Sequence, residues 1–123
     1  QLPLSKVVPV LNERAVTSLQ AIAARQRVDQ QVIDYAVRLA RATRDWSGLA
    51  QGAGSRGALG LVRGGRAVAL LEGRNFVIPD DIKRVALPAL RHRIAVAPDA
   101  LLEGRKADDL LSAVIENVPA PRV

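Results

Sequence analysis

The chain has 123 residues, 49% of them apolar and 24% charged, which is enough for one domain with its own core. It has no cysteine and one histidine, His92, which excludes disulfide scaffolds, thiolate zinc sites, cysteine catalysis and histidine metal clusters. The net charge is +6 and fifteen of the eighteen basic residues are arginine, a balance that suits either a phosphate-bearing partner or ordinary solvated helix faces.

Other absences narrow the possibilities further. Tyr35, Trp46 and Phe76 are the only aromatic residues, which disfavours a nucleic-acid reader that stacks bases on exposed rings. The longest apolar run, residues 67–71, is far shorter than the ~20 residues that span a bilayer. No secretion signal opens the chain, and methionine is absent, so we expect it to be a piece of a longer product.

Residues 1–11 contain two prolines and no helical period, so we expect an extended segment that leads into the domain. Asn12 is a suitable helix N-cap, and apolar residues then recur at three- and four-residue steps, which predicts a helix to about Arg27. A second helix is predicted from its N-cap, Asp29, to about Thr43. Arginines fill its second half, where positive charge suits the helix dipole.

The glycine-rich stretch at residues 45–54 has no period and predicts a loop. Ser55 is expected to cap a third helix that runs to about Gly73. Four glycines lie inside this helix, and each costs roughly 1 kcal/mol relative to alanine. Their presence makes sense if something packs closely against the backbone, most simply a neighbouring helix. They are Gly57, Gly60, Gly64 and Gly65.

Pro79, followed by Asp80 and Asp81, is a strong helix start. Pro88 should break this helix and open a short turn through Arg93, because proline lacks an amide donor and clashes with the preceding turn. The remaining elements are a short extended piece, a loop with one helical turn and a last helix, at residues 94–96, 98–105 and 108–118. The sum is an all-α bundle of about five helices with one short extended segment.

Few residues have the pattern of a catalytic site. The chain lacks the phosphate-binding loop Gly-x-x-x-x-Gly-Lys-Ser/Thr and the Gly-x-Ser-x-Gly elbow of serine hydrolases. Paired acids at residues 80–81 and 108–109 stand at helix starts, where capping explains them better than catalysis does. His92 has no carboxylate or nucleophile nearby in the sequence, which favours a structural role. Trp46 suits a partner contact or a plug over the bundle equally well.

Arg56 breaks a local rule. It stands in the first turn of the third predicted helix, where its charge repels the positive end of the helix dipole and where stability alone would favour an acid. Departures of this kind tend to occur at functional positions. The free N–H groups of a helix N-terminus attract anions, and the forked guanidinium donors suit phosphate oxygens. The residues alone leave two interpretations of Arg56 open: it contacts a phosphate, or it is an ordinary surface arginine.

The run Gly-Ala-Gly-Ser-Arg-Gly-Ala-Leu at residues 52–59 resembles the sensor-2 segment of MoxR-type AAA+ ATPases. Other segments agree with this family in order and spacing, and together they cover nearly the whole chain. They are residues 34–44, Arg63, residues 66–67, Leu70, residues 73–83, 90–94, 102–104, 108–110 and 118–119. Two residues depart from the family pattern: Ser55 replaces a frequent proline, and Ile78 replaces a threonine cap worth ~1 kcal/mol.

The resemblance implies that residues 12–123 form the lid, the small helical domain that follows the nucleotide-binding core, and that residues 1–11 lead in from that core. ATP with Mg²⁺ would be the cofactor of the parent protein, and none is expected on this fragment alone. The family assembles into rings, usually hexamers, and acts as chaperone-like remodellers, often beside proteins with von Willebrand A domains. The expected partners are therefore the protein's own core, neighbouring ring subunits and such proteins, in the cytoplasm.

The resemblance also assigns roles to residues. The sensor-2 arginine of the family reaches the γ-phosphate of ATP on the core, and Arg56 stands at the matching position. Gly54 and Ser55 would bind nucleotide beside it, and Tyr35 or Leu39 would line the adenine side. At ~4 Å and an effective dielectric constant of about 20, one such charge pair is on the order of 4 kcal/mol before desolvation, enough to bias a hinge between core and lid.

Two other functions stay open. One is a basic helical module that binds nucleic acid, for which Arg38, Arg41 and Arg44 offer a modest patch. The other is a bundle that binds a protein without nucleotide, which leaves the placement of Arg56 unexplained. The chain supplies no nucleophile, metal site or phosphate loop, so the fragment alone is predicted to be inactive and the parent protein to hydrolyse ATP.

Overall fold

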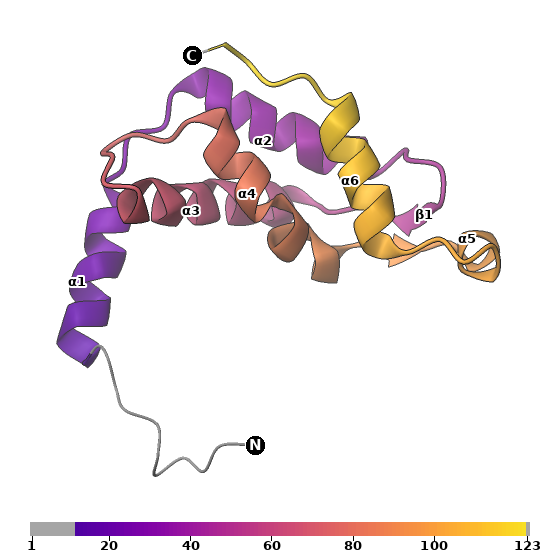
Figure 1. Ribbon diagram of the computed structural model, residues 1–123, viewed down its shortest axis with the longest axis horizontal. Helices are drawn as coiled ribbons and strands as arrows, with labels where there is room; N and C mark the ends of the chain where they lie inside the picture. Colours follow the sequence, from indigo (N-terminus) through magenta and orange to yellow (C-terminus); the bar gives the residue numbers. More distant parts are fainter. Residues whose placement is uncertain (1–11, 123) are drawn as a thin grey trace, which may run out of the picture.

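The elements of the domain are helical, apart from two short strands. The computed structural model describes residues 12–122, so the predicted lead-in at residues 1–11 lies outside the described range. Within it, Figure 1 shows helices α1 (Glu13–Ala24), α2 (Gln30–Ala42), α3 (Ser55–Leu71), α4 (Pro79–Leu90), α5 (Pro98–Leu102) and α6 (Ala107–Asn117). The other elements are β1 (Leu49–Gln51), β2 (Ala95–Val96) and a 3-10 turn, η2 (Arg91–Arg93). The all-α prediction is confirmed.

The core lies between α2, α3, α4 and α6. On α2 the fully buried side chains fall at three- and four-residue steps, which is the apolar stripe that the sequence predicted. Burial of one leucine or valine side chain contributes roughly 1.5–3 kcal/mol, so these helices supply most of the packing energy. The fully buried apolar residues include Val32, Tyr35, Leu39, Leu61, Ile82, Leu90, Leu111 and Val114.

Glycines let α3 and α4 approach each other closely. A Cβ at Gly65 would lie 2.8 Å from Cδ1 of Ile82, and a Cβ at Gly64 would lie 3.0 Å from Cγ2 of Val85. At Gly57 a Cβ would lie 2.7 Å from that of Ala53. The expected close helix contact with α4 is therefore confirmed, and Gly57 takes part in it, because a Cβ there would also lie 3.2 Å from Cδ2 of Leu90 at the end of α4. Gly60 differs, since a Cβ there would meet no atom within 4 Å.

Helix α1 stands at the edge of the domain. The Asn12 side chain accepts a hydrogen bond from the Ala15 amide at 2.8 Å, which confirms the predicted cap. The helix has no buried residue, and Figure 1 shows it projecting from one end of the bundle, beside α3. It ends at Ala24 rather than near Arg27, because the backbone of Arg27 bonds to the segment before α4: its amide to the Asn75 carbonyl and its carbonyl to the Val77 amide.

Two sequence predictions about the segments that follow α2 and α4 were wrong in part. The stretch at residues 45–54 is not all loop, because Leu49–Gln51 forms β1 and pairs antiparallel with β2. The sequence predicted β2 as a short extended piece but did not predict β1, the strand with which it pairs. Helix α4 also continues through Pro88 to Leu90. Pro88 is exposed and Leu90 is fully buried, so packing of the last turn outweighs the hydrogen bond that the proline cannot make.

Candidate functional site at the start of α3

Hydrogen bonds of the Thr43 side chain fix the segment between α2 and α3 to the end of α2. The hydroxyl donates to the Ala40 carbonyl at 2.6 Å and accepts from the Ala53 amide at 2.8 Å, and the whole side chain is buried. Gly52 lets the same segment approach the backbone of Arg44 closely, because a Cβ at Gly52 would lie only 2.6 Å from it. The first turn of α3 is therefore held at a fixed place beside the last turn of α2.

The N-cap of α3 is Gly54, so the expectation that Ser55 caps this helix was wrong; Ser55 is the first helical residue. Gly54 has extended backbone angles and offers no side-chain acceptor. A Cβ at Gly54 would meet no atom within 4 Å. The first N–H groups of α3 therefore have no side-chain cap, at the end of the helix where the dipole favours an anion.

A hollow of about 400 Å³ lies between α2 and the start of α3, and we call it the α2–α3 hollow. Gly54 and Ser55, both predicted as nucleotide contacts, line it. The remaining lining combines small apolar side chains with two arginines. These residues are Val37, Ala40, Arg41, Arg44, Ala53 and Ala58.

Tyr35 does not line this hollow. It is fully buried in the core, as is Leu39, so neither predicted adenine contact has exposed surface with which to meet a ligand. The Arg38 guanidinium lies 5.6 Å from the centre of the Tyr35 ring, and burial raises the pKa of the phenol although the Arg38 charge opposes this. On α2 the hollow is lined by residues 37, 40, 41 and 44, and their three- and four-residue steps along the helix could have identified them as one side of it.

Arg56 is exposed in the first turn of α3. Across residues 12–122 it has no ion pair and no side-chain hydrogen bond. It lines a second hollow, of about 350 Å³, together with Leu59, Gly60, Arg63 and Arg93. We call this the cationic hollow. Arg63 follows Arg56 by two helical turns, so the sequence could have paired them, but only the packing of η2 against α3 brings in Arg93.

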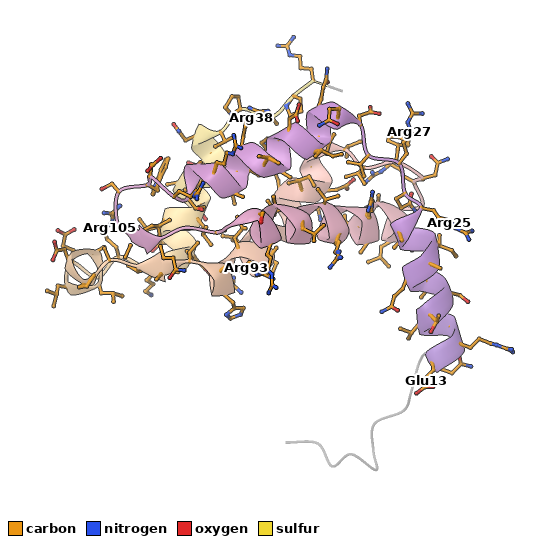
Figure 2. All side chains as sticks on the ribbon, turned by 180° about the vertical axis from the view of Figure 1, so that it is seen from behind. Glu13, Arg25, Arg27, Arg38, Arg93 and Arg105 are labelled. Atoms are coloured by element: carbon orange, nitrogen blue, oxygen red, sulfur yellow. The ribbon has the colours of Figure 1, made fainter. Side chains whose placement is uncertain are left out.

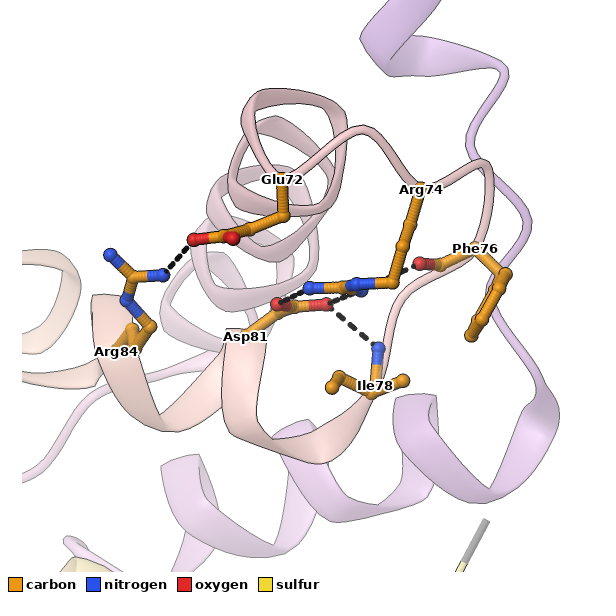
Figure 3. Close-up of polar contacts among 6 residues, drawn as sticks. All are labelled: Glu72, Arg74, Phe76, Ile78, Asp81 and Arg84. Atoms are coloured by element: carbon orange, nitrogen blue, oxygen red, sulfur yellow. Dashed lines mark hydrogen bonds and ion pairs between the residues drawn. The ribbon is translucent and has the colours of Figure 1, made fainter.

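The first acid pair of the sequence caps a helix, as predicted. The Asp81 carboxylate is 1% exposed and accepts from Arg74 at 2.6 and 2.7 Å and from the Ile78 amide at 2.8 Å, as Figure 3 shows. Burial alone would raise the pKa of Asp81, but these hydrogen bonds and the positive charges of Arg74 and Arg84 outweigh it, so the pKa is lowered. Asp81 therefore supplies one half of a capping box by accepting from the Ile78 amide, whereas the side-chain acceptor that a threonine at position 78 would offer the first turn of α4 is absent.

The structure also shows the surroundings of three other residues that the sequence singled out, Asp108, Trp46 and His92. Asp108 pairs with Arg91 at 2.8 and 3.0 Å, and this contact lowers the pKa of the Asp108 carboxyl. Trp46 is half-buried against the core, which favours the plug over the partner contact. His92 lies exposed in η2.

In the described part of the chain no group of three or more acids and histidines is placed to hold a metal ion. No helix among these residues has the length and apolarity to cross a membrane.

Comparisons with known proteins agree with this geometry. The model of the AAA lid domain family matches residues 41–114. The chain is 34% identical to Chaperone MoxR1 of Mycobacterium tuberculosis, over 93% of this chain and 33% of that protein. It is 31% identical to the uncharacterised protein YeaC of Bacillus subtilis, over 97% and 37%. It is 44% identical to Protein MoxR of Methylorubrum extorquens, over 57% and 21%.

A solved structure is similar in fold as well. A candidate ATPase from Cytophaga hutchinsonii matches 89% of this chain with a TM-score of 0.81 and 25% identity, and the match covers 36% of that protein. The chain thus spans about a third of the length of MoxR1, of YeaC and of this ATPase.

Proposed function

Because this chain belongs to the AAA lid domain family and is a relative of the MoxR proteins, we propose that it is the lid of a MoxR-type ATPase. In this proposal the domain closes over ATP bound on a core domain, and Arg56 contacts the γ-phosphate. The angle of the lid then differs between the ATP and ADP states. That motion drives chaperone-like remodelling of partner proteins by a ring of subunits in the cytoplasm, with von Willebrand A domain proteins among the candidate partners.

The observation that carries this proposal is the setting of Arg56. Its guanidinium is exposed and unpaired in residues 12–122, at a helix start where its charge works against the dipole. An anion that binds there offsets the unfavourable interaction between the Arg56 charge and the helix dipole, which gives a reason for an arginine at this position. A phosphate oxygen satisfies both the guanidinium donors and the uncapped N–H groups behind Gly54.

The residues around Arg56 fit a nucleotide. The uncapped start of α3 and the cationic hollow suit phosphate groups, whereas the small apolar side chains that line the α2–α3 hollow together with Arg41 and Arg44 suit the flat face of a base. Gly54 and Ser55 line the α2–α3 hollow, and the next residue, Arg56, lines the cationic hollow. When bound on the core, ATP with Mg²⁺ supplies the phosphoryl group that is hydrolysed. Arg56 stabilises negative charge on that group, and the lid shields it from bulk water.

The packing of α3 explains how one arginine moves a whole domain. Gly64 and Gly65 hold α3 against α4 at van der Waals distance, and Thr43 holds the start of α3 to α2. When Arg56 binds a phosphate and shifts, α2, α3 and α4 therefore move together as one body, and no single helix bends. A contact on the order of 4 kcal/mol at an effective dielectric constant of about 20 is enough to bias such a rigid-body hinge.

The test is steady-state ATP hydrolysis by the full-length protein that contains this chain, with Arg56→Ala compared to wild type. We expect turnover to fall by about 100-fold or more, the cost of losing a charged contact in the transition state. The melting temperature should change little, because Arg56 has no partner in the described domain. Wild-type turnover in Arg56→Ala would overturn the proposal.

A matched control separates this role from a general loss of positive charge. Arg84→Ala removes an exposed arginine of α4 whose only described contact is an ion pair with Glu72 at 2.6 Å. Exposed pairs of this kind contribute little to stability. Hydrolysis by Arg84→Ala should stay at the wild-type level, and a loss equal to that of Arg56→Ala would show that overall charge, not position, matters.

A further inference from the structure

The cationic hollow contains more positive charge than one phosphate sensor needs. Three arginines line it: Arg56 and Arg63 from α3, and Arg93 from η2. The ion pairs found in residues 12–122 use other arginines, namely Arg27, Arg74, Arg84 and Arg91. The side chains that face this hollow are therefore not neutralised by any carboxylate of the described domain.

The α3 side of the hollow contains no acid either, and Asp108, which reaches η2 from α6, is paired with Arg91. Residues 46–71, which include all of α3, contain three arginines and no aspartate or glutamate. The nearest acids on α4, Asp80 and Asp81, stand at the end of that helix opposite to η2. Three like charges around one hollow repel one another, so the arrangement opposes folding unless an anion is bound there.

One glycine that lines this hollow, Gly60, is not required by the packing of the core. A Cβ at Gly60 would meet no atom within 4 Å, so there is open space in the hollow beside Arg56 and Arg63. The stem of Arg93 lies beside α3: its Cδ is 3.8 Å from the place that a Cβ at Gly57 would occupy. Figure 2 shows Arg93 beside α3, on the side away from α2.

We propose that Arg63 and Arg93 bind the terminal phosphates of the same nucleotide that Arg56 contacts, so that the cationic hollow is a three-arginine triphosphate site. This inference rests on the proposed function and extends it. Guanidinium groups from two separate elements can surround a phosphoryl group, whereas Arg56 alone can approach it from one side only. Three fixed positive charges also match the charge of a triphosphate better than that of a diphosphate, so the site should distinguish ATP from ADP.

The test measures equilibrium binding of a non-hydrolysable ATP analogue and of ADP to the full-length protein. The variants are Arg56→Gln, Arg63→Gln and Arg93→Gln, with Arg84→Gln as the matched control. Each of the three should weaken binding of the ATP analogue by about tenfold, the effect of losing one charge-assisted hydrogen bond. Binding of ADP should weaken less, and the control should bind both as wild type does.

The outcomes separate the two proposals. Wild-type affinity for the ATP analogue in either Arg63→Gln or Arg93→Gln overturns the three-arginine site, and the proposed function stands if Arg56→Gln still weakens binding. Wild-type affinity in all three variants overturns both. An equal loss for the ATP analogue and ADP in the Arg63 and Arg93 variants also overturns the three-arginine site, because a merely structural role affects both nucleotides alike.

A second variant keeps the proposal testable if Arg93→Gln does not fold. Gly60→Asp places a carboxylate in the hollow at a position with open space, so the fold should tolerate it. It should neutralise part of the arginine charge and weaken binding of the ATP analogue, whereas the uncharged Gly60→Asn should have a much smaller effect. Equal affinity in Gly60→Asp and Gly60→Asn overturns the proposal.

Discussion

Removal of the Asp81 carboxylate should destabilise the domain through the connection between α3 and α4. Asp81 bonds to both terminal nitrogens of Arg74, which follows α3, and to the Ile78 amide at the start of α4 (Figure 3). The carboxylate is 1% exposed, and the side chain of Arg74 is 24% exposed. Asp81→Ala leaves the Ile78 amide without this acceptor and the Arg74 guanidinium with the Phe76 carbonyl alone, which accepts from it at 3.0 Å.

The size of the effect follows from this burial. Loss of one partner of a buried ion pair costs about 3–5 kcal/mol, and the partial exposure of Arg74 places the expected cost near the lower end, at about 3 kcal/mol. For a domain of this length, that corresponds to a fall in melting temperature of roughly 10 °C. Asp80→Ala removes the neighbouring exposed acid from the same helical turn and should cause a much smaller fall.

The same pair predicts a pH dependence. Because the pKa of Asp81 is lowered in the folded domain, its contribution is complete above the unfolded-state pKa of about 3.9 and is lost as the pH falls through the folded value. Thermal unfolding followed by circular dichroism at pH 7 and at pH 3 measures both effects. The difference between wild type and Asp81→Asn should shrink at the lower pH.

Two results would refute this reasoning. If Asp81→Ala lowers the melting temperature no more than Asp80→Ala does, the buried pair contributes little and the connection is held by apolar packing alone. If the difference between wild type and Asp81→Asn is the same at both values of pH, the carboxylate charge is not the stabilising element.

Three further predictions concern the packing that positions the site. Gly65→Ala should destabilise the domain by about 1–3 kcal/mol in denaturant unfolding, because its Cβ would lie 2.8 Å from Cδ1 of Ile82; an unchanged midpoint would show that α3 and α4 can separate freely. Gly60→Ala should instead be neutral or stabilising by up to about 1 kcal/mol, since the added carbon meets no atom, and a loss would reveal a contact that the described residues do not contain. Thr43→Val should cost about 1–3 kcal/mol, because it leaves the buried Ala53 amide unpaired; hydrogen exchange at that amide should accelerate, and unchanged exchange would exclude the tie between α2 and α3.

Much of the fold could be predicted from local sequence patterns. The apolar stripe of α2, the cap at Asn12 and the proline start of α4 depend on neighbours within one or two turns, and the structure confirms all three. Strand β1 could not be predicted, because three residues in a glycine-rich stretch are extended only through pairing with β2, which lies more than 40 residues further on. The helix through Pro88 was missed because burial of Leu90, a tertiary effect, decides it.

The candidate site shows the same division. Arg56 stood out from the sequence because its charge conflicts with its position in the helix, which is a local property. Tyr35 was a poor choice for a ligand contact because it is fully buried on the apolar stripe of α2, and the α2–α3 hollow is lined by Val37 and Ala40 instead. The approach of Arg93 to α3 depends on the path of the chain after α4, which no local pattern indicates.

The most direct test of the central proposal is hydrogen exchange on the full-length protein, with a non-hydrolysable ATP analogue compared to ADP. The proposal predicts that the ATP analogue slows exchange at the amides of residues 54–57 more than ADP does, and that Arg56→Ala abolishes this difference. Identical exchange at these amides in both nucleotide states of the wild-type protein would contradict a lid that senses the γ-phosphate through Arg56.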